Sequence, residues 1–132
     1  MSEKFNLEIV SPEKSFLKKD DVIEVVVPAF EGEMGILKDH ISIISFLKPG
    51  VIKVNSNNEN NSFYVDDGIV EFKDNTLSIL TSDIFDLKNS DKVKIQDMIK
   101  EAEKNLADEK LDDQKRFIMS QKVDVLRSLN IN

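Results

Sequence analysis

Two carboxylates and one imidazole lie close together near the start of the chain, and they are the first residues to test for chemistry. Glu31 and Glu33 flank Gly32, and His40 is the only histidine of the 132 residues. A carboxylate and an imidazole can act as acid and base. However, no nucleophile motif accompanies His40, and both glutamates are expected in a solvated turn where neither is strongly desolvated. A small hydrolase built on Glu33 and His40 is therefore the least favoured function.

Metal and cofactor sites find little support in the residue types. The chain has no cysteine, and no residues at metal-ligand spacing accompany its one histidine. A glycine-rich phosphate loop ending in Gly-Lys-Ser/Thr is also absent from the sequence. We predict a protein that is not an enzyme and that needs no metal or cofactor. A lone histidine after a turn is more often a surface or interface side chain than a ligand.

The stretch from Pro28 to Gly50 positions these residues. Gly32 and Gly35 are three apart, which predicts a tight turn that presents both carboxylates, with Gly35 expected to require a positive φ. The apolar run 41–47 predicts a buried strand, and Lys48-Pro49-Gly50 predicts a second turn before the next strand.

Apolar residues that alternate with polar ones predict a series of short strands through the first two thirds of the chain. Turn-forming residues separate them at KKDD (18–21), at SNNENN (56–61), at Asp66-Asp67-Gly68 and at 73–76. The pattern predicts about ten short strands in a β sandwich or flattened barrel covering residues 1–86.

The period changes at residue 87, and no Gly or Pro follows residue 68. Asn89 or Ser90 can cap a first helix, whose apolar stripe is Ile95, Ile99, Ala102 and Leu106. Asp112 or Asp113 can cap a second helix, whose apolar face is expected to be Ile118, Val125 and Leu129, with Phe117, Met119, Val123 and Leu126 beside it. Residues 87–132 are therefore predicted to form a C-terminal antiparallel α-helical hairpin.

Charge and hydropathy narrow the environment and the partners. The net charge is −7, which argues against nucleic acid as a partner. Residues 1–86 carry 8 basic and 16 acidic side chains and residues 87–132 carry 10 and 9, so the two parts are expected to meet different partners. The sequence has no apolar run long enough for a membrane span and no signal-peptide pattern, which predicts a soluble protein that is not exported.

Several motifs together resemble the epsilon subunit of F-type ATP synthases. They are EGEMGIL (31–37), His40 three residues later, LKPG (47–50), DGIVE (67–71) and KEAEKNL (100–106). The resemblance covers nearly the whole chain. It implies a non-catalytic subunit of the central stalk at the cytoplasmic face of the inner (plasma) membrane. The sandwich would link the gamma subunit to the c-ring rotor, and the hairpin would extend toward the alpha/beta catalytic head and inhibit ATP hydrolysis.

The resemblance also implies roles for individual residues. The turn with Glu31, Gly32, Glu33 and Gly35 would face the rotor ring, and His40 would face gamma. The extended hairpin would contact the catalytic head through Lys115, Arg116, Lys122 and Arg127.

Some members of the family that this chain resembles bind ATP through an [I/L]-D-x-x-R-A motif at the start of the first helix. This chain has only part of that motif. Asp91 is kept, but Lys94 replaces an arginine and Ile95 an alanine. Lysine cannot supply the bidentate fork of arginine, so ATP binding to the hairpin is expected to be weak.

One alternative from the residues alone stays open, which is a free-standing β-sandwich binding module with a helical dimerisation tail.

Overall fold

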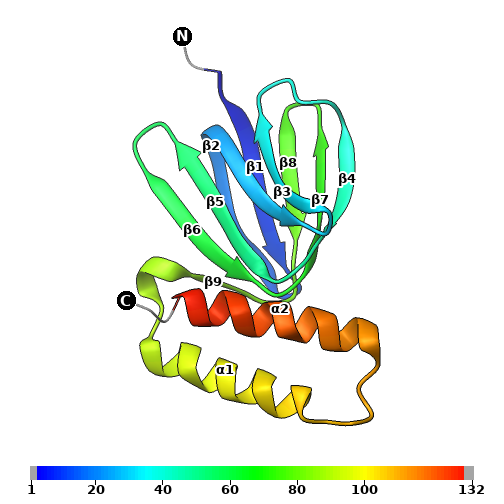
Figure 1. Ribbon diagram of the computed structural model, residues 1–132. Coiled ribbons are helices and arrows are strands. Elements are labelled where there is room, and N and C mark those ends of the chain that lie inside the picture. Colours follow the sequence, from blue (N-terminus) through cyan, green and yellow to red (C-terminus); the bar gives the residue numbers. More distant parts are fainter. Residues whose placement is uncertain (1–2, 130–132) are drawn as a thin grey trace. The chain divides into compact units, whose positions relative to one another are not determined.

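The fold was analysed in a computed structural model, which describes residues 3–129. These residues form nine strands, a 3₁₀ turn at Leu87–Asn89 and two helices (Figure 1). The chain divides into two compact units between Lys88 and Asn89, and each is described by itself. The strands are β1 (Phe5–Ser11), β2 (Lys14–Ala29), β3 (Gly32–Leu37), β4 (Ile43–Leu47), β5 (Gly50–Ser56), β6 (Asn60–Val65), β7 (Gly68–Lys73), β8 (Thr76–Leu80) and β9 (Ile84–Asp86). The helices are α1 (Lys92–Leu106) and α2 (Asp113–Leu129).

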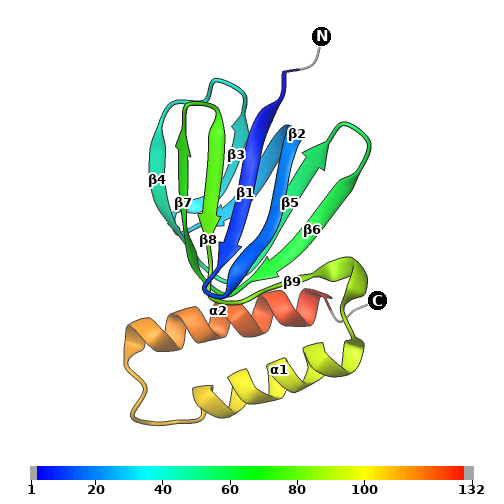
Figure 2. The same ribbon diagram turned by 180° about the vertical axis from the view of Figure 1, so that it is seen from behind.

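The first unit is the predicted β sandwich. In one layer β1, β8, β7 and β4 are neighbours, and in the other β2 lies between β3 and β5, followed by β6 and β9 (Figures 1 and 2). β1 pairs with β8 in parallel, and the other pairs are antiparallel. β2 belongs to both layers, because its first half pairs with β1 and its second half with β3 and β5.

The length of β2 corrects one prediction. The KKDD segment was expected to be a solvated turn between two strands, but β2 continues through it. Lys18 pairs with Glu8 and Lys19 with Leu7 on the neighbouring strand, so the backbone of this charged segment has ladder partners. Two predicted strands are therefore one, and the sandwich has nine strands in the described residues instead of about ten.

The core of the sandwich follows the predicted alternation. Phe5, Leu7 and Ile9 of β1 are buried, and the ring edge of Phe5 meets Phe72 of β7 with centroids 5.6 Å apart. Such edge-to-face pairs add to the free energy of apolar burial. The tight turn between β7 and β8 has Asp74 at φ 51° and Asn75 at φ 52°, the left-handed pair that a two-residue hairpin needs.

The prediction of a buried strand over 41–47 is wrong. β4 begins at Ile43, and its side chains alternate, so Ile44 is 71% exposed and Phe46 is 61% exposed while Leu47 is buried. An unbroken apolar run usually indicates a strand covered on both faces. Here the run is interrupted by Ser42 and Ser45 and belongs to a strand that pairs with β7 and, at Leu47, with β2. Its inward side chains face the core, while the outward ones are left exposed.

The second unit is the predicted helical hairpin, and α1 packs against α2. Asp91 caps α1 by accepting a hydrogen bond from the Val93 N–H at 2.9 Å, so the predicted caps Asn89 and Ser90 are wrong by one or two residues. Asp112 caps α2, accepting from the Lys115 N–H at 2.8 Å, as predicted.

The buried face of α1 contains Ile95, Ile99 and Ala102, as predicted. On α2 the buried residues are Val123 and Leu126, which were predicted beside the apolar face, while Ile118, Val125 and Leu129 at its predicted centre are half-buried. The centre of the face was therefore predicted wrongly. α2 has seven apolar residues spread around its circumference, and spacing alone does not select one face.

Candidate functional site

The turn between β2 and β3 holds the predicted ring-facing residues. Phe30 and Glu31 form the turn itself, and Gly32 follows with φ 139°, a conformation that side chains rarely adopt. Glu31 and Glu33 are both exposed, so the predicted display of two carboxylates is correct. They belong to different elements, however, because Glu33 lies inside β3 and pairs with Pro28.

Gly35 corrects a second expectation about this turn. It lies in β3 opposite Val26 and is not among the residues with positive φ. A Cβ at Gly35 would meet the Glu24 carboxylate at 3.5 Å, an ordinary van der Waals distance. The conformational requirement for glycine is therefore at Gly32 and not at Gly35.

His40 lies in the connection between β3 and β4, and it is held in place. Its Nδ1 is 2.7 Å from the carbonyl oxygen of Ile41, and its ring meets Phe72 edge-on at 6.0 Å. The preceding residue, Asp39, has φ 66° and exchanges two hydrogen bonds with Asn75, of 2.8 and 3.0 Å. The His40 loop and the β7–β8 turn therefore form one fixed end of this layer.

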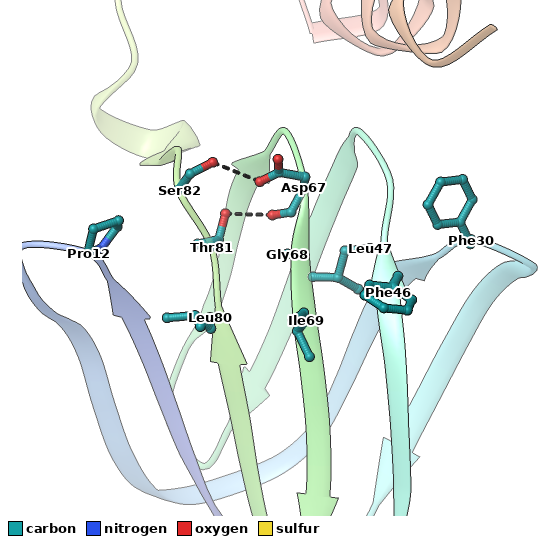
Figure 3. Close-up of a pocket in the computed structure, with 10 residues that line it drawn as sticks. All are labelled: Pro12, Phe30, Phe46, Leu47, Asp67, Gly68, Ile69, Leu80, Thr81 and Ser82. Atoms are coloured by element: carbon teal, nitrogen blue, oxygen red, sulfur yellow. Dashed lines mark hydrogen bonds between the residues drawn. The ribbon is translucent and has the colours of Figure 1, made fainter. Parts of the chain in front are cut away.

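Three exposed apolar side chains form a row across the outer face of the sandwich, which sequence reasoning missed. Phe46 lies opposite Ile69 in the β4–β7 ladder, and Ile69 lies opposite Leu80 in the β7–β8 ladder. Their exposed fractions are 61%, 41% and 53%. We call Phe46, Ile69 and Leu80 the apolar row. Figure 3 shows Ile69 between the other two, with Phe30 beyond Phe46.

The apolar row lines a groove that polar groups close at one end. Thr81 Oγ1 donates to the Asp67 carbonyl at 2.6 Å, and Ser82 Oγ donates to the Asp67 carboxylate at 2.8 Å (Figure 3). These bonds fix the β6–β7 bend against the end of β8. In the sequence, each of these three strands has an apolar residue at an outward position. That pattern identifies a patch only once the order of the strands in the sheet is known.

Basic residues of the hairpin differ in what they contact. The guanidinium of Arg116 donates to the carbonyl oxygens of Leu106 at 2.7 Å and Asp108 at 2.9 Å, and Arg127 forms an ion pair with Glu103. Lys115 is exposed, and Lys122 is half-buried. The predicted head-contact set is therefore not one uniform solvated face.

The predicted ATP-sensing residues lie at the start of α1. The exposed Asp91 carboxylate accepts the N-cap hydrogen bond at Oδ1, and Lys94 is exposed three residues later. Among residues 3–129, no group of three or more His, Asp or Glu side chains could hold a metal ion. Within the same range, neither helix has the length and apolar character of a membrane span.

Comparison with known proteins connects this geometry to a family. Residues 4–86 match the family model described as the ATP synthase delta/epsilon chain, beta-sandwich domain. The ATP synthase epsilon chain of Pelagibacter ubique is 62% identical over 130 residues, which is 98% of this chain and 100% of that protein. That of Parvibaculum lavamentivorans is 35% identical over 98% of this chain and 97% of its own.

Two cryo-EM structures share the fold. A chain of the Euglena gracilis mitochondrial ATP synthase (OSCP/F1/c-ring) gives a TM-score of 0.75 at 21% identity, over 96% of this chain and 79% of its own. A chain of the Tetrahymena thermophila mitochondrial ATP synthase (central stalk/c-ring) gives 0.67 at 18% identity, over 95% of both chains. The sequence matches decide between the two interpretations that the residues left open. The chain belongs to the delta/epsilon family of ATP synthase subunits, as a non-catalytic epsilon subunit of the central stalk of the F-type enzyme.

Proposed function

We propose that this subunit joins the gamma subunit to the c-ring through its sandwich, and that its hairpin restrains ATP hydrolysis by contacting the alpha/beta head. The ring would hold the protein at the cytoplasmic face of the inner (plasma) membrane. The observation that carries the proposal is the apolar row, because three exposed apolar side chains on adjacent strands form a contiguous patch that is costly to leave in water.

The gamma subunit is the occupant that we propose for the apolar row. The exposed apolar surface continues along β4 through Ile44 to Ile41, which is 76% exposed and follows His40 in the loop. One partner that covers β4 along its length would therefore meet both the apolar row and the predicted gamma-facing histidine. The carboxylates of Asp67 and Glu31 at the same end of the sandwich favour a partner whose apolar contact is ringed by Lys or Arg.

The c-ring is the partner that we propose for the β2–β3 turn. Glu31 and Glu33 extend into solvent there, and the strands on either side pair over six positions, so the turn is rigidly supported. Two exposed carboxylates fit a ring surface that offers basic or amide groups. Each such contact would be weak alone and would depend on ionic strength.

Gamma capture is the direct test of the apolar row. We expect Phe46→Ser/Ile69→Ser to lower retention of co-expressed gamma by tenfold or more, because the centre of an interface contributes most of its binding free energy. Val93→Ser is the matched control, since Val93 is 60% exposed but lies on α1. Equal capture by the double variant and the control would contradict the assignment of gamma to the apolar row.

A second arm tests the ring. Membranes that hold the c-ring but lack the head should bind wild type, and they should bind Glu31→Gln/Glu33→Gln less tightly. Glu71→Gln is a matched control, because Glu71 is exposed on the outer face of β7. If the control loses as much binding as the double variant, general surface charge and not the β2–β3 turn attracts the ring.

A further inference from the structure

The connection between α1 and α2 has one turn of its own, in which the Asp108 carboxylate accepts from the Lys110 N–H at 3.0 Å and the Asp108 carbonyl accepts from the Leu111 N–H at 3.2 Å. Residues 107–112 contain no glycine and no proline, so no residue there is specialised for a left-handed or fixed φ. A helix also ends with four carbonyl groups that lack partners within the helix. In α1 these belong to residues 103–106.

Backbone groups of the connection satisfy three of these four carbonyls. The Ala107 N–H donates to Glu103 and Lys104, both at 3.2 Å, and the Asp108 N–H donates to Asn105 at 3.2 Å. The fourth carbonyl, that of Leu106, accepts from Arg116 at 2.7 Å. The C-terminus of α1 is therefore complete only when a side chain from α2 is in place.

The same guanidinium also holds the connection itself. Its Nη2 donates to the carbonyls of Asp108 at 2.9 Å and Leu111 at 3.4 Å. Hydrogen bonds from a charged donor are stronger than neutral ones, and a cation is favoured at a helix C-terminus. Three carbonyls spread over six residues thus converge on one planar group.

We propose that Arg116 is a clasp that keeps the hairpin closed, so that α1 and α2 separate only when its guanidinium releases these carbonyls. Arg116 then belongs to the interior of the hairpin and not to the basic surface offered to the catalytic head. The clasp acts within residues 89–132, so the inference holds whether or not the hairpin restrains ATP hydrolysis. The Glu103–Arg127 ion pair adds a second, more exposed contact between the helices.

Amide hydrogen exchange of the full chain tests the clasp. In Arg116→Ala, exchange of the amides of residues 104–116 should accelerate about tenfold or more, because loss of even one hydrogen bond from a charged donor shifts an opening equilibrium by that factor. Arg116→Lys keeps the charge but not the planar fork, and should accelerate exchange by a smaller factor. Lys115→Ala is the control, because Lys115 is next to Arg116 on the same helix and its side chain is exposed.

Distances between α1 and α2 distinguish an opened hairpin from a hairpin that has only lost the cap of α1, because loss of the cap alone would not change these distances. The chain has no cysteine, so spin labels can be placed on Lys100→Cys in α1 and Asp124→Cys in α2, both exposed positions. Arg116→Ala and Arg116→Lys should each add a population with longer inter-helix distances, while Lys115→Ala should not. If Arg116→Ala unfolds the hairpin, Arg116→Lys decides. Wild-type exchange and distances in Arg116→Lys, together with wild-type behaviour or global unfolding in Arg116→Ala, would overturn the clasp.

Discussion

Replacing the two glycines of β3, Gly32 and Gly35, one at a time separates backbone strain from side-chain contact. Gly32 has φ 139°, and a Cβ there would meet nothing within 4 Å, so any cost of Gly32→Ala comes from the backbone conformation alone. A non-glycine residue held in such a region costs about 1–3 kcal/mol. Gly35 has an ordinary strand conformation and only the Glu24 carboxylate nearby, so Gly35→Ala should change the free energy of unfolding by less than about 0.5 kcal/mol.

Tyrosine fluorescence during thermal unfolding measures this difference directly. Tyr64 is the only tyrosine, there is no tryptophan, and Tyr64 is buried in the sandwich, so the signal reports on that unit. For a domain of this size, 1 kcal/mol shifts the melting temperature by about 4–8 °C. Gly32→Ala should therefore melt several degrees below wild type and Gly35→Ala close to it. Equal losses in the two variants, or a larger loss in Gly35→Ala, would refute the reasoning.

The remaining predictions concern pH and the hairpin. Burial, and then the carboxylate of Asp66 at 2.7 Å, raise the pKa of Tyr64 above its usual value near 10, so its contribution to stability is present below about pH 10 and is lost as pH rises further. Alkaline unfolding followed by circular dichroism should start at about pH 10 in wild type and be less steep in Tyr64→Phe; equal steepness would contradict this. In the assembled enzyme, protein ending at Ser90 and Lys115→Glu/Lys122→Glu/Arg127→Glu should both allow faster ATP hydrolysis than the intact chain. Lys115→Glu/Lys122→Glu, which retains the Arg127–Glu103 pair, should change the rate in the same direction. Indistinguishable rates would mean that the hairpin is structural here.

Local patterns predicted the elements of this fold well, and tertiary pairing decided where prediction failed. The alternation of Phe5, Leu7 and Ile9 predicts a half-buried strand because the period of two is a property of the strand itself. The turn expected at 18–21 did not form because its backbone found partners on β1, which lies ten residues away in sequence. The apolar run of β4 could not reveal its exposed face, because exposure depends on which strands lie beside it.

In the candidate site, too, local sequence predicted some features, and others depended on how the strands pair. Glu31 and Glu33 were predicted to be exposed because turn residues are usually solvated. The apolar row could not be predicted, since Phe46, Ile69 and Leu80 come together only through two cross-strand registers. Gly35 was assigned a conformation that belongs to Gly32, because two glycines three apart do not indicate which of them has the positive φ.

Tertiary contacts also decide which basic side chains of α2 are available to a partner. Lys115 and Arg116 are adjacent in sequence and equal in charge, and a count of charges treats them alike. One residue on a helix rotates the side chain by about 100°, which leaves Lys115 in solvent and directs Arg116 to the carbonyls of α1 and the connection. A basic surface that binds an acidic partner must have charge that is not already compensated within the hairpin. Arg116, and to a lesser extent Arg127, would have to give up partners before they could contribute, so any restraint on hydrolysis should depend more on Lys115 than on either arginine while the hairpin stays closed.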